Sequence, residues 1–180
     1  MRKTVLAALM VCAVCAALFG QSAEDLVKSG YALESGNAHY GREDYDKAIA
    51  DFTQAIKLNP RLASAYFGRG SAYAFKKDYD KAIADYTETI KINPRVDLAY
   101  AARGLVYIEK KDYDKAIADY TEAIRLDPKF AMYYRERGIA YYAKNDYDKA
   151  IADFAAALNI NPNDTETKEA LEQAKKARGY

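Results

Sequence analysis

The chain has 180 residues, enough for one sizeable domain, and its 27 basic and 26 acidic residues nearly balance. Because there is no basic excess, the composition argues against electrostatic binding of nucleic acid or of an anionic membrane surface. The aromatic content is unusual, with 17 Tyr and no Trp.

Residues 1–23 are predicted to be a signal peptide that directs export. Two basic residues precede an uninterrupted apolar run from Val5 to Phe19, which is shorter than the roughly 20 residues of a membrane-spanning helix. Small residues follow, and cleavage is expected after Gly20 or after Ala23. The predicted location is therefore periplasmic or secreted, with no membrane span left after cleavage. An uncleaved signal anchor is the alternative.

Both cysteines, Cys12 and Cys15, lie inside this apolar run. The mature domain is therefore predicted to contain no disulfide, thiolate metal site or cysteine nucleophile, which suits an oxidising compartment. Lipidation of a cysteine is an alternative. It fits poorly, because Val11 and Val14 stand where a bacterial lipoprotein signal needs a small residue.

An octapeptide, Asp-Tyr-Asp-Lys-Ala-Ile-Ala-Asp, recurs four times at a constant step and organises the rest of the chain. Its copies begin at Asp44, Asp78, Asp112 and Asp146. A proline recurs at the same step, at Pro60, Pro94, Pro128 and Pro162. The domain at residues 24–164 thus divides into four units, at about 29–62, 63–96, 97–130 and 131–164.

Each unit is predicted to be a pair of helices. The first helices are expected near residues 25–41, 64–76, 98–110 and 132–144. The second helices are expected from about 45, 79, 113 and 147 to the residue before each proline. The Asp that opens each octapeptide is a suitable N-cap, because its carboxylate accepts hydrogen bonds from the free amides of the first turn. Each proline ends its helix because it disfavours helical geometry in the preceding residue.

Apolar residues follow the helical period in both kinds of helix. In the second helices Ala48, Phe52 and Ile56 form one stripe, which the later copies repeat. In the first helices a Gly lies between two tyrosines, as in Tyr66-x3-Gly70, and we expect another helix to approach closely there. A single hairpin cannot bury these faces alone, so the units are predicted to stack as a solenoid.

With these motifs and a period of about 34 residues, the chain resembles the tetratricopeptide repeat family over roughly residues 29–164. The resemblance implies an all-α fold, a right-handed superhelical solenoid of four helix-turn-helix repeats plus a C-terminal capping helix at residues 165–180. The first copy departs most from the pattern, since Ala32, Ser35 and His39 replace an aromatic residue, Arg and Tyr.

Arginine and aspartate recur together in the repeats. Arg69, Arg103 and Arg137 adjoin the close-packing Gly of the first helices, and the second helices carry Asp51, Asp85, Asp119 and Asp153. Since a guanidinium binds a carboxylate through two hydrogen bonds, we expect a ladder of Arg–Asp pairs joining helices within or between units. Ligand binding by these arginines is the alternative.

The sequence offers little for catalysis, and we predict that the protein is not an enzyme and has no cofactor or metal. His39 is the only histidine and stands where other copies place a packing Tyr. No Gly-rich phosphate loop, HExxH motif or nucleophile elbow occurs. The Asp pairs around Tyr45 and its equivalents suggest calcium, but the first Asp is expected to cap a helix, and the bidentate Glu of a calcium loop is missing.

The resemblance implies that the first helices line a concave surface. On the side opposite Tyr66, Gly70 and Tyr73 we predict an apolar groove, because exposed apolar surface marks binding sites and suits an amphipathic helix or an extended segment. Its predicted residues are Leu33, Asn37, Tyr40, Phe67, Ser71, Phe75, Leu98, Ala101, Leu105, Ile108, Arg135 and Ile139. The capping helix is expected to cover Met132, Ile139 and Tyr142, leaving Phe67, Phe75, Leu98, Leu105 and Ile108 more accessible.

Co-chaperones of this family grip a C-terminal carboxylate with Lys and Asn. The matching places here hold Leu33, Asn37, Gly68, Leu98 and Ala102, of which only Asn37 agrees. The predicted function is a protein–protein interaction scaffold of the bacterial cell envelope that binds a partner protein or peptide in the groove, and no nucleic acid. The alternative is a structural protein that forms homo-oligomers through the groove or the end faces.

Overall fold

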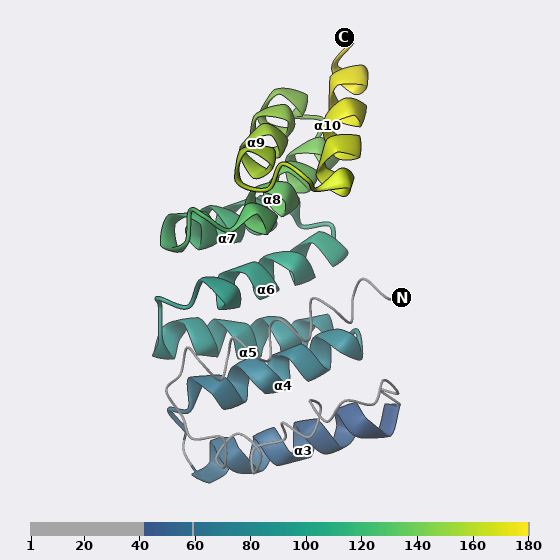
Figure 1. Cartoon of the computed structure of the whole chain (residues 1–180). Coiled ribbons are helices and arrows are strands. Elements are labelled where there is room, and N and C mark those ends of the chain that lie inside the picture. The colour runs from purple at the N-terminus through teal and green to yellow at the C-terminus, as the bar shows by residue number, and fades with distance from the viewer. Residues whose placement is uncertain (1–41, 59, 180) are drawn as a thin grey trace. The chain divides into compact units, whose positions relative to one another are not determined.

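The computed structural model describes residues 42–58 and 60–179, which fold into eight α-helices and no strand (Figure 1). The predicted all-α helical-repeat solenoid is confirmed. None of the described helices is long and apolar enough to cross a membrane. The predicted signal peptide, the first helix expected near 25–41 and His39 lie outside the described residues. The chain forms two compact units, one ending at Ala99 and one beginning at Tyr100.

The first unit contains α3 (Arg42–Leu58), α4 (Ala63–Phe75), α5 (Tyr79–Ile92) and the start of α6 (Asp97–Glu109). Helix α4 packs against both α3 and α5 (Figure 1). Large rings fill the space between them, and all three are buried: Phe52 from α3, Phe67 from α4 and Tyr86 from α5. The rings of Phe67 and Tyr86 are in contact, with centroids 5.3 Å apart.

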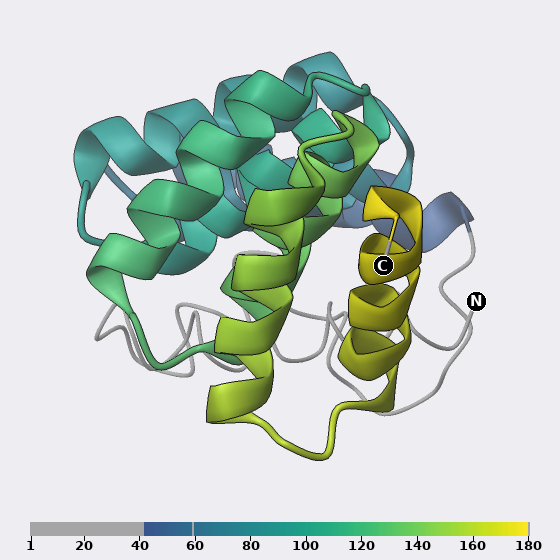
Figure 2. The ribbon, with the colours of Figure 1, turned by 90° about the horizontal axis from the view of Figure 1, so that it is seen from above.

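The second unit contains the rest of α6, then α7 (Tyr113–Leu126), α8 (Ala131–Ala143), α9 (Tyr147–Ile160) and α10 (Thr165–Arg178). Each helix from α7 onward packs against the next, and α10 lies beside α9 in the view from above (Figure 2). The buried rings here are Tyr120, Tyr133 and Phe154. The predicted capping helix is α10.

The second helices end just before their prolines. Their last residue comes one position before the predicted one, which was the residue directly preceding each proline. Asn93, Asp127 and Asn161 precede their prolines and leave helical geometry, with ψ of 97°, 91° and 87°. The steric conflict between a proline ring and the backbone before it is the physical reason. The following first helices begin shortly after each of these positions.

The predicted aspartate caps are confirmed in part. Asp112 and Asp146 accept hydrogen bonds from the amides of Lys115 and Lys149. Asp78 precedes α5 but makes no such bond; its carboxylate binds Lys81 Nζ at 2.5 Å, as Asp112 and Asp146 bind the Nζ of Lys115 and Lys149. Asp44 was wrongly predicted as a cap, because α3 already begins at Arg42. Arg and Glu are good helix formers, so the preceding two residues can extend the helix past the aspartate.

The turns inside the hairpins place one residue in the left-handed region: Lys77 (φ 60°), Lys111 (φ 60°) and Asn145 (φ 62°). Asparagine tolerates this conformation better than lysine. We therefore expect Lys111→Asn to raise the free energy of unfolding by about 0.5–1 kcal/mol, measured by urea denaturation. The reverse change, Asn145→Lys, should lower it by a similar amount. A Lys111→Asn variant less stable than the parent would contradict this explanation.

Candidate functional site

The predicted Arg–Asp ladder is confirmed. Arg103 donates two hydrogen bonds to the carboxylate of Asp119, through Nε at 2.9 Å and Nη2 at 2.7 Å. The same paired geometry, with both distances 2.8 Å, joins Arg69 to Asp85 and Arg137 to Asp153. All three carboxylates are buried. Each pair thus ties the first helix of a repeat to its second helix.

Arg69 and Arg137 also contact the preceding repeat. Arg69 Nη1 donates to Thr53 on α3 at 3.1 Å, and Arg137 Nη1 donates to Thr121 on α7 at 3.0 Å. The guanidinium of Arg137 also lies over the ring of Tyr134, 5.9 Å from its centroid. One side chain therefore joins three helices, which supports the structural interpretation of these arginines over ligand binding.

Burial perturbs the ionisation of the pair formed by Arg103 and Asp119. Burial raises the pKa of Asp119, although its hydrogen bonds with Arg103 act in the opposite direction. Those hydrogen bonds raise the pKa of Arg103 despite its own burial. Because the carboxylate has lost most of its water, it depends on the guanidinium for solvation.

The glycines of the first helices allow close helix contact, as predicted. A Cβ added at Gly138 would lie 2.7 Å from the Phe154 ring, and one at Gly104 would lie 3.1 Å from the Tyr120 ring. The structure adds a contact that the repeat pattern did not predict. A Cβ at Gly68 would lie 2.3 Å from the Phe52 ring on α3. Helix α4 therefore approaches a neighbour closely on two sides.

The predicted groove residues fall into four groups. Leu33, Asn37 and Tyr40 lie outside the described residues. Phe75 and Leu105 are exposed, at 38% and 44%. The half-buried members are Ser71, Ile108, Arg135 and Ile139. The buried members are Phe67, Leu98 and Ala101.

The expectation that Phe67 and Leu98 are accessible was wrong. Phe67 lies three residues before Gly70, hence on the same side of the helix, and its ring packs on Tyr86. Ala101 has the same spacing from Gly104 and is buried too. The side that carries the close-packing Gly is thus wider than we predicted, and the exposed strip is narrower.

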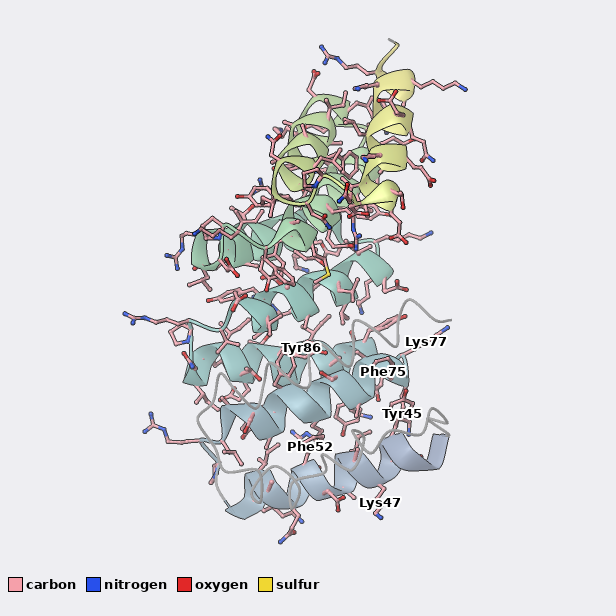
Figure 3. The ribbon with its side chains drawn as sticks, in the orientation of Figure 1. Tyr45, Lys47, Phe52, Phe75, Lys77 and Tyr86 are labelled. Carbon is pink, nitrogen blue, oxygen red and sulfur yellow. The ribbon has the colours of Figure 1, made fainter. Side chains whose placement is uncertain are left out.

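The exposed strip of the first unit ends in a pair of stacked rings. Phe75 on α4 lies face to face with Tyr45 on α3, with centroids 5.2 Å apart and an interplanar angle of 11° (Figure 3). Beside them Lys76 forms an ion pair with Asp46. Ser71 is engaged inside the unit, because its hydroxyl donates to the Phe67 carbonyl and accepts from Tyr86 Oη at 3.2 Å. Tyr45 was missed as a neighbour of Phe75, since the two belong to different repeats and lie far apart in the sequence.

In the second unit, Arg135 is held by three carboxylates. It donates to Glu136 Oε1 from Nε and Nη2 at 3.2 and 3.1 Å, and to Asp164 from Nη1 at 3.2 Å. Glu166 lies 3.5 Å from the same Nη1. Burial raises the pKa of Glu136, against the opposing effect of Arg135. Sequence reasoning missed this cluster, because its members recur in no other repeat.

Ile139 and Tyr142 pack against a buried cluster of Ala150, Phe154 and Ala174. Ala174 belongs to α10, and the expectation that the capping helix covers Met132, Ile139 and Tyr142 stays a prediction. Among the residues that the structure describes, no group of three or more His, Cys, Asp or Glu is arranged to hold a metal ion.

Stacked helical hairpins with short turns and a periodic Gly–aromatic contact define a helical-repeat protein. Family profiles described as tetratricopeptide repeat match residues 33–96 and 104–175. The chain belongs to the tetratricopeptide repeat family.

Similar solved structures agree with this family assignment. The TPR domain of Arabidopsis OM64 is 31% identical, with a TM-score of 0.61 over 63% of this chain and 94% of that one. The first TPR of Spaghetti (RPAP3), bound to the HSP90 peptide SRMEEVD, is 25% identical, with a TM-score of 0.64 over 66% and 94%. MamA, 19% identical, has a TM-score of 0.77 over 87% and 81% and shows the fold alone. No curated protein matches the chain in sequence.

Proposed function

We propose that this chain is a protein–protein interaction module that binds a partner peptide or helix through apolar residues of its first helices. Membership of the tetratricopeptide repeat family supports this, as does the similar RPAP3 domain, which is bound to a peptide. Within each unit the recurring polar groups hold helices together, which leaves the remaining strip of each first helix for recognition.

One observation carries the proposal. Among the described residues, the exposed large hydrophobic side chains are Phe75, Leu105 and Ile160, and the first two lie on first helices within the predicted strip. Leu105 stands at the repeat position of Ser71 and Ile139. An exposed Leu on a helix that buries its other faces is a suitable anchor for an apolar partner side chain.

The partner is proposed to be recognised by apolar anchors and not by a terminal carboxylate. Gly68, Leu98 and Ala102 stand at places where carboxylate-binding members of the family use Lys or Asn, and none of them carries a charged or amide group. A peptide with apolar residues at helical spacing fits the strip better than an acidic C-terminus does.

Export to the cell envelope is also part of the proposal, and it rests on the N-terminal sequence. A basic start, an apolar run from Val5 to Phe19 and small residues before the first acidic ones are typical of a cleaved signal. Cell fractionation followed by N-terminal sequencing of the mature protein tests it. A protein that still starts at Met1 and is recovered in the cytoplasmic fraction would rule out export.

The binding strip is tested by crosslinking the chain in envelope extract and comparing the captured bands. We expect Leu105→Asp and Phe75→Asp to remove a specific partner band, because a carboxylate cannot enter an apolar contact without losing its hydration. Helicity by circular dichroism should be unchanged, since both side chains are exposed in the native fold, although Phe75→Asp also removes the stacking contact with Tyr45.

Ile160→Asp provides the matched control, because Ile160 is equally exposed but lies at the end of a second helix. Loss of the same band in Ile160→Asp, or its retention in both other variants, would contradict the proposed strip. Light scattering over a range of concentrations tests the alternative of self-association.

A further inference from the structure

Helix α10 occupies the place that the first helix of a fifth repeat would take. It begins at Thr165, the repeat position at which Ala131 begins α8, and its two fully buried residues, Thr167 and Ala174, match Tyr133 and Ala140. Arg178 binds Asp148 on α9 at 2.7 Å. In the same way, one repeat earlier, Lys144 of the α8–α9 turn pairs with Asp114 on α7. Helix α10 therefore docks on α9 as α8 docks on α7.

Three residues that pack or pair in an inner first helix have different counterparts in α10. Where α8 has Arg137, Gly138 and Tyr141, α10 has Leu171, Glu172 and Lys175. Leu171 cannot form the bidentate guanidinium bridge that Arg137 forms with Asp153. The apolar contribution of α10 comes mostly from small side chains, with Ala174 buried and Ala170 and Leu171 half-buried. The small buried side chains of α10 bury less apolar area than a ring such as that of Tyr133 does, which lowers the cost of opening this segment.

Polar contacts at both ends hold α10 in place instead. At the N-terminus, Asp164 accepts hydrogen bonds from the amides of Glu166 and Thr167, from the Thr167 hydroxyl at 2.7 Å and from Arg135. At the C-terminus, the Arg178–Asp148 pair is exposed. Exposed pairs of this kind contribute little stability and are readily exchanged.

Beneath α10 lies apolar surface of α8 and α9. Phe154 and Ala150 are buried there together with Ala174, and Ile139, Tyr142 and Ile151 pack around them. Two residues of the predicted binding groove, Arg135 and Ile139, are thus already engaged by this part of the chain itself.

We propose that α10 is a detachable lid, and that a partner helix binds the surface of α8 and α9 that α10 covers. The chemistry of the partner follows from α10: a carboxylate at the N-terminus of the helix to bind Arg135, and a small residue at the place of Ala174 to pack against Ala150 and Phe154. This rests on the proposed function and specifies the partner, but opening of the lid is measurable without one.

The experiment uses the full chain and two readouts. In the variant Asp164→Ala/Arg178→Ala, hydrogen exchange of residues 165–178 should become at least tenfold faster, while exchange in α7 and α8 stays unchanged. A labelled synthetic peptide with the sequence of residues 163–179 should bind this variant at least tenfold more tightly than it binds the native chain. The same peptide carrying Ala174→Asp should bind neither.

Lys168→Ala is the matched control, an exposed residue on α10 whose removal should leave both readouts unchanged. The lid is overturned if exchange in α10 rises only together with α8 and α9, or if the peptide fails to bind the double variant. Its failure is distinct from that of the proposed function. A Leu105→Asp variant can still lose its partner band when the lid does not open, and the lid can open when no band is lost.

Discussion

Arg103→Met is expected to lower the free energy of unfolding by about 3–5 kcal/mol, measured by urea denaturation followed by circular dichroism. The substitution removes both hydrogen bonds to Asp119 and leaves a carboxylate that is only 6% exposed without its cation. The cost comes from the stranded charge more than from the lost attraction. The double variant Arg103→Met/Asp119→Leu should therefore recover most of the lost stability.

The pH dependence of this variant distinguishes a stranded charge from lost packing. Burial already raises the pKa of Asp119, and loss of Arg103 removes the contacts that oppose this effect. A folded-state pKa above the unfolded value means that the folded chain binds the proton more tightly. Proton binding by Asp119 therefore adds to the free energy of unfolding below the ordinary pKa of the carboxyl group, and this contribution is lost as pH rises through the folded-state pKa. The difference in free energy of unfolding between the parent and Arg103→Met should thus be smaller near pH 4 than at pH 7.

Arg125→Met is the matched control. Arg125 binds Glu122 at 2.6 Å, but its side chain is 65% exposed, so both charges remain hydrated when the pair is broken. We expect a loss of no more than about 1 kcal/mol. Equal losses in the two variants, or a deficit in Arg103→Met that does not change with pH, would show that burial of the carboxylate is not the cause.

Gly138→Ala is expected to destabilise the chain by about 1–3 kcal/mol. Alanine favours a helix over glycine by about 1 kcal/mol, so helix propensity alone predicts the opposite sign. The added Cβ would lie 2.7 and 2.9 Å from ring atoms of Phe154. That ring is buried against Ala150 and Ala174, so it cannot shift without displacing α9 or α10.

Gly104→Ala tests whether the distance between the added Cβ and the facing ring determines the loss of stability. It is the same substitution at the same repeat position, but the nearest atoms of the Tyr120 ring are 3.1 to 3.3 Å from the added Cβ. A shift of a few tenths of an ångström is enough there, and the gain in helix propensity offsets part of the cost. The midpoint temperature of thermal denaturation should therefore be lower for Gly138→Ala than for Gly104→Ala. The opposite ranking would show that contact distance does not govern these glycines.

The helices and the ladder were predictable because both are properties of the repeat. A proline determines the end of a second helix through the residue directly before it, and Asn93 and Asp127 leave helical geometry as expected. Each Arg precedes its Asp by the same 16 residues in every complete copy, so one pairing serves all of them. The threonine that also accepts from this arginine, Thr53 or Thr121, lies 16 residues before it in both cases, but this contact joins two neighbouring repeats and was not predicted.

The candidate binding surface was predicted less well. The periodicity of apolar residues along a single helix predicts one buried side and one exposed side. It placed Phe75 and Leu105 on the exposed side, and both are exposed in the structure. It placed Phe67 there too, although Phe67 is buried against Tyr86. A first helix such as α4 packs against helices on two sides, and the width of its exposed strip depends on both contacts together.

The amino-acid sequence alone predicted the all-α class, the repeating helical hairpin, the ends of the second helices before the prolines and a ladder of Arg–Asp pairs, because each of these recurs from unit to unit. The tertiary structure decided which side chains of the first helices remain exposed, how Arg135 came to bind Asp164, and that α10 takes the position of a first helix. These features depend on the packing of several helices at once, and no single helical period carries that information.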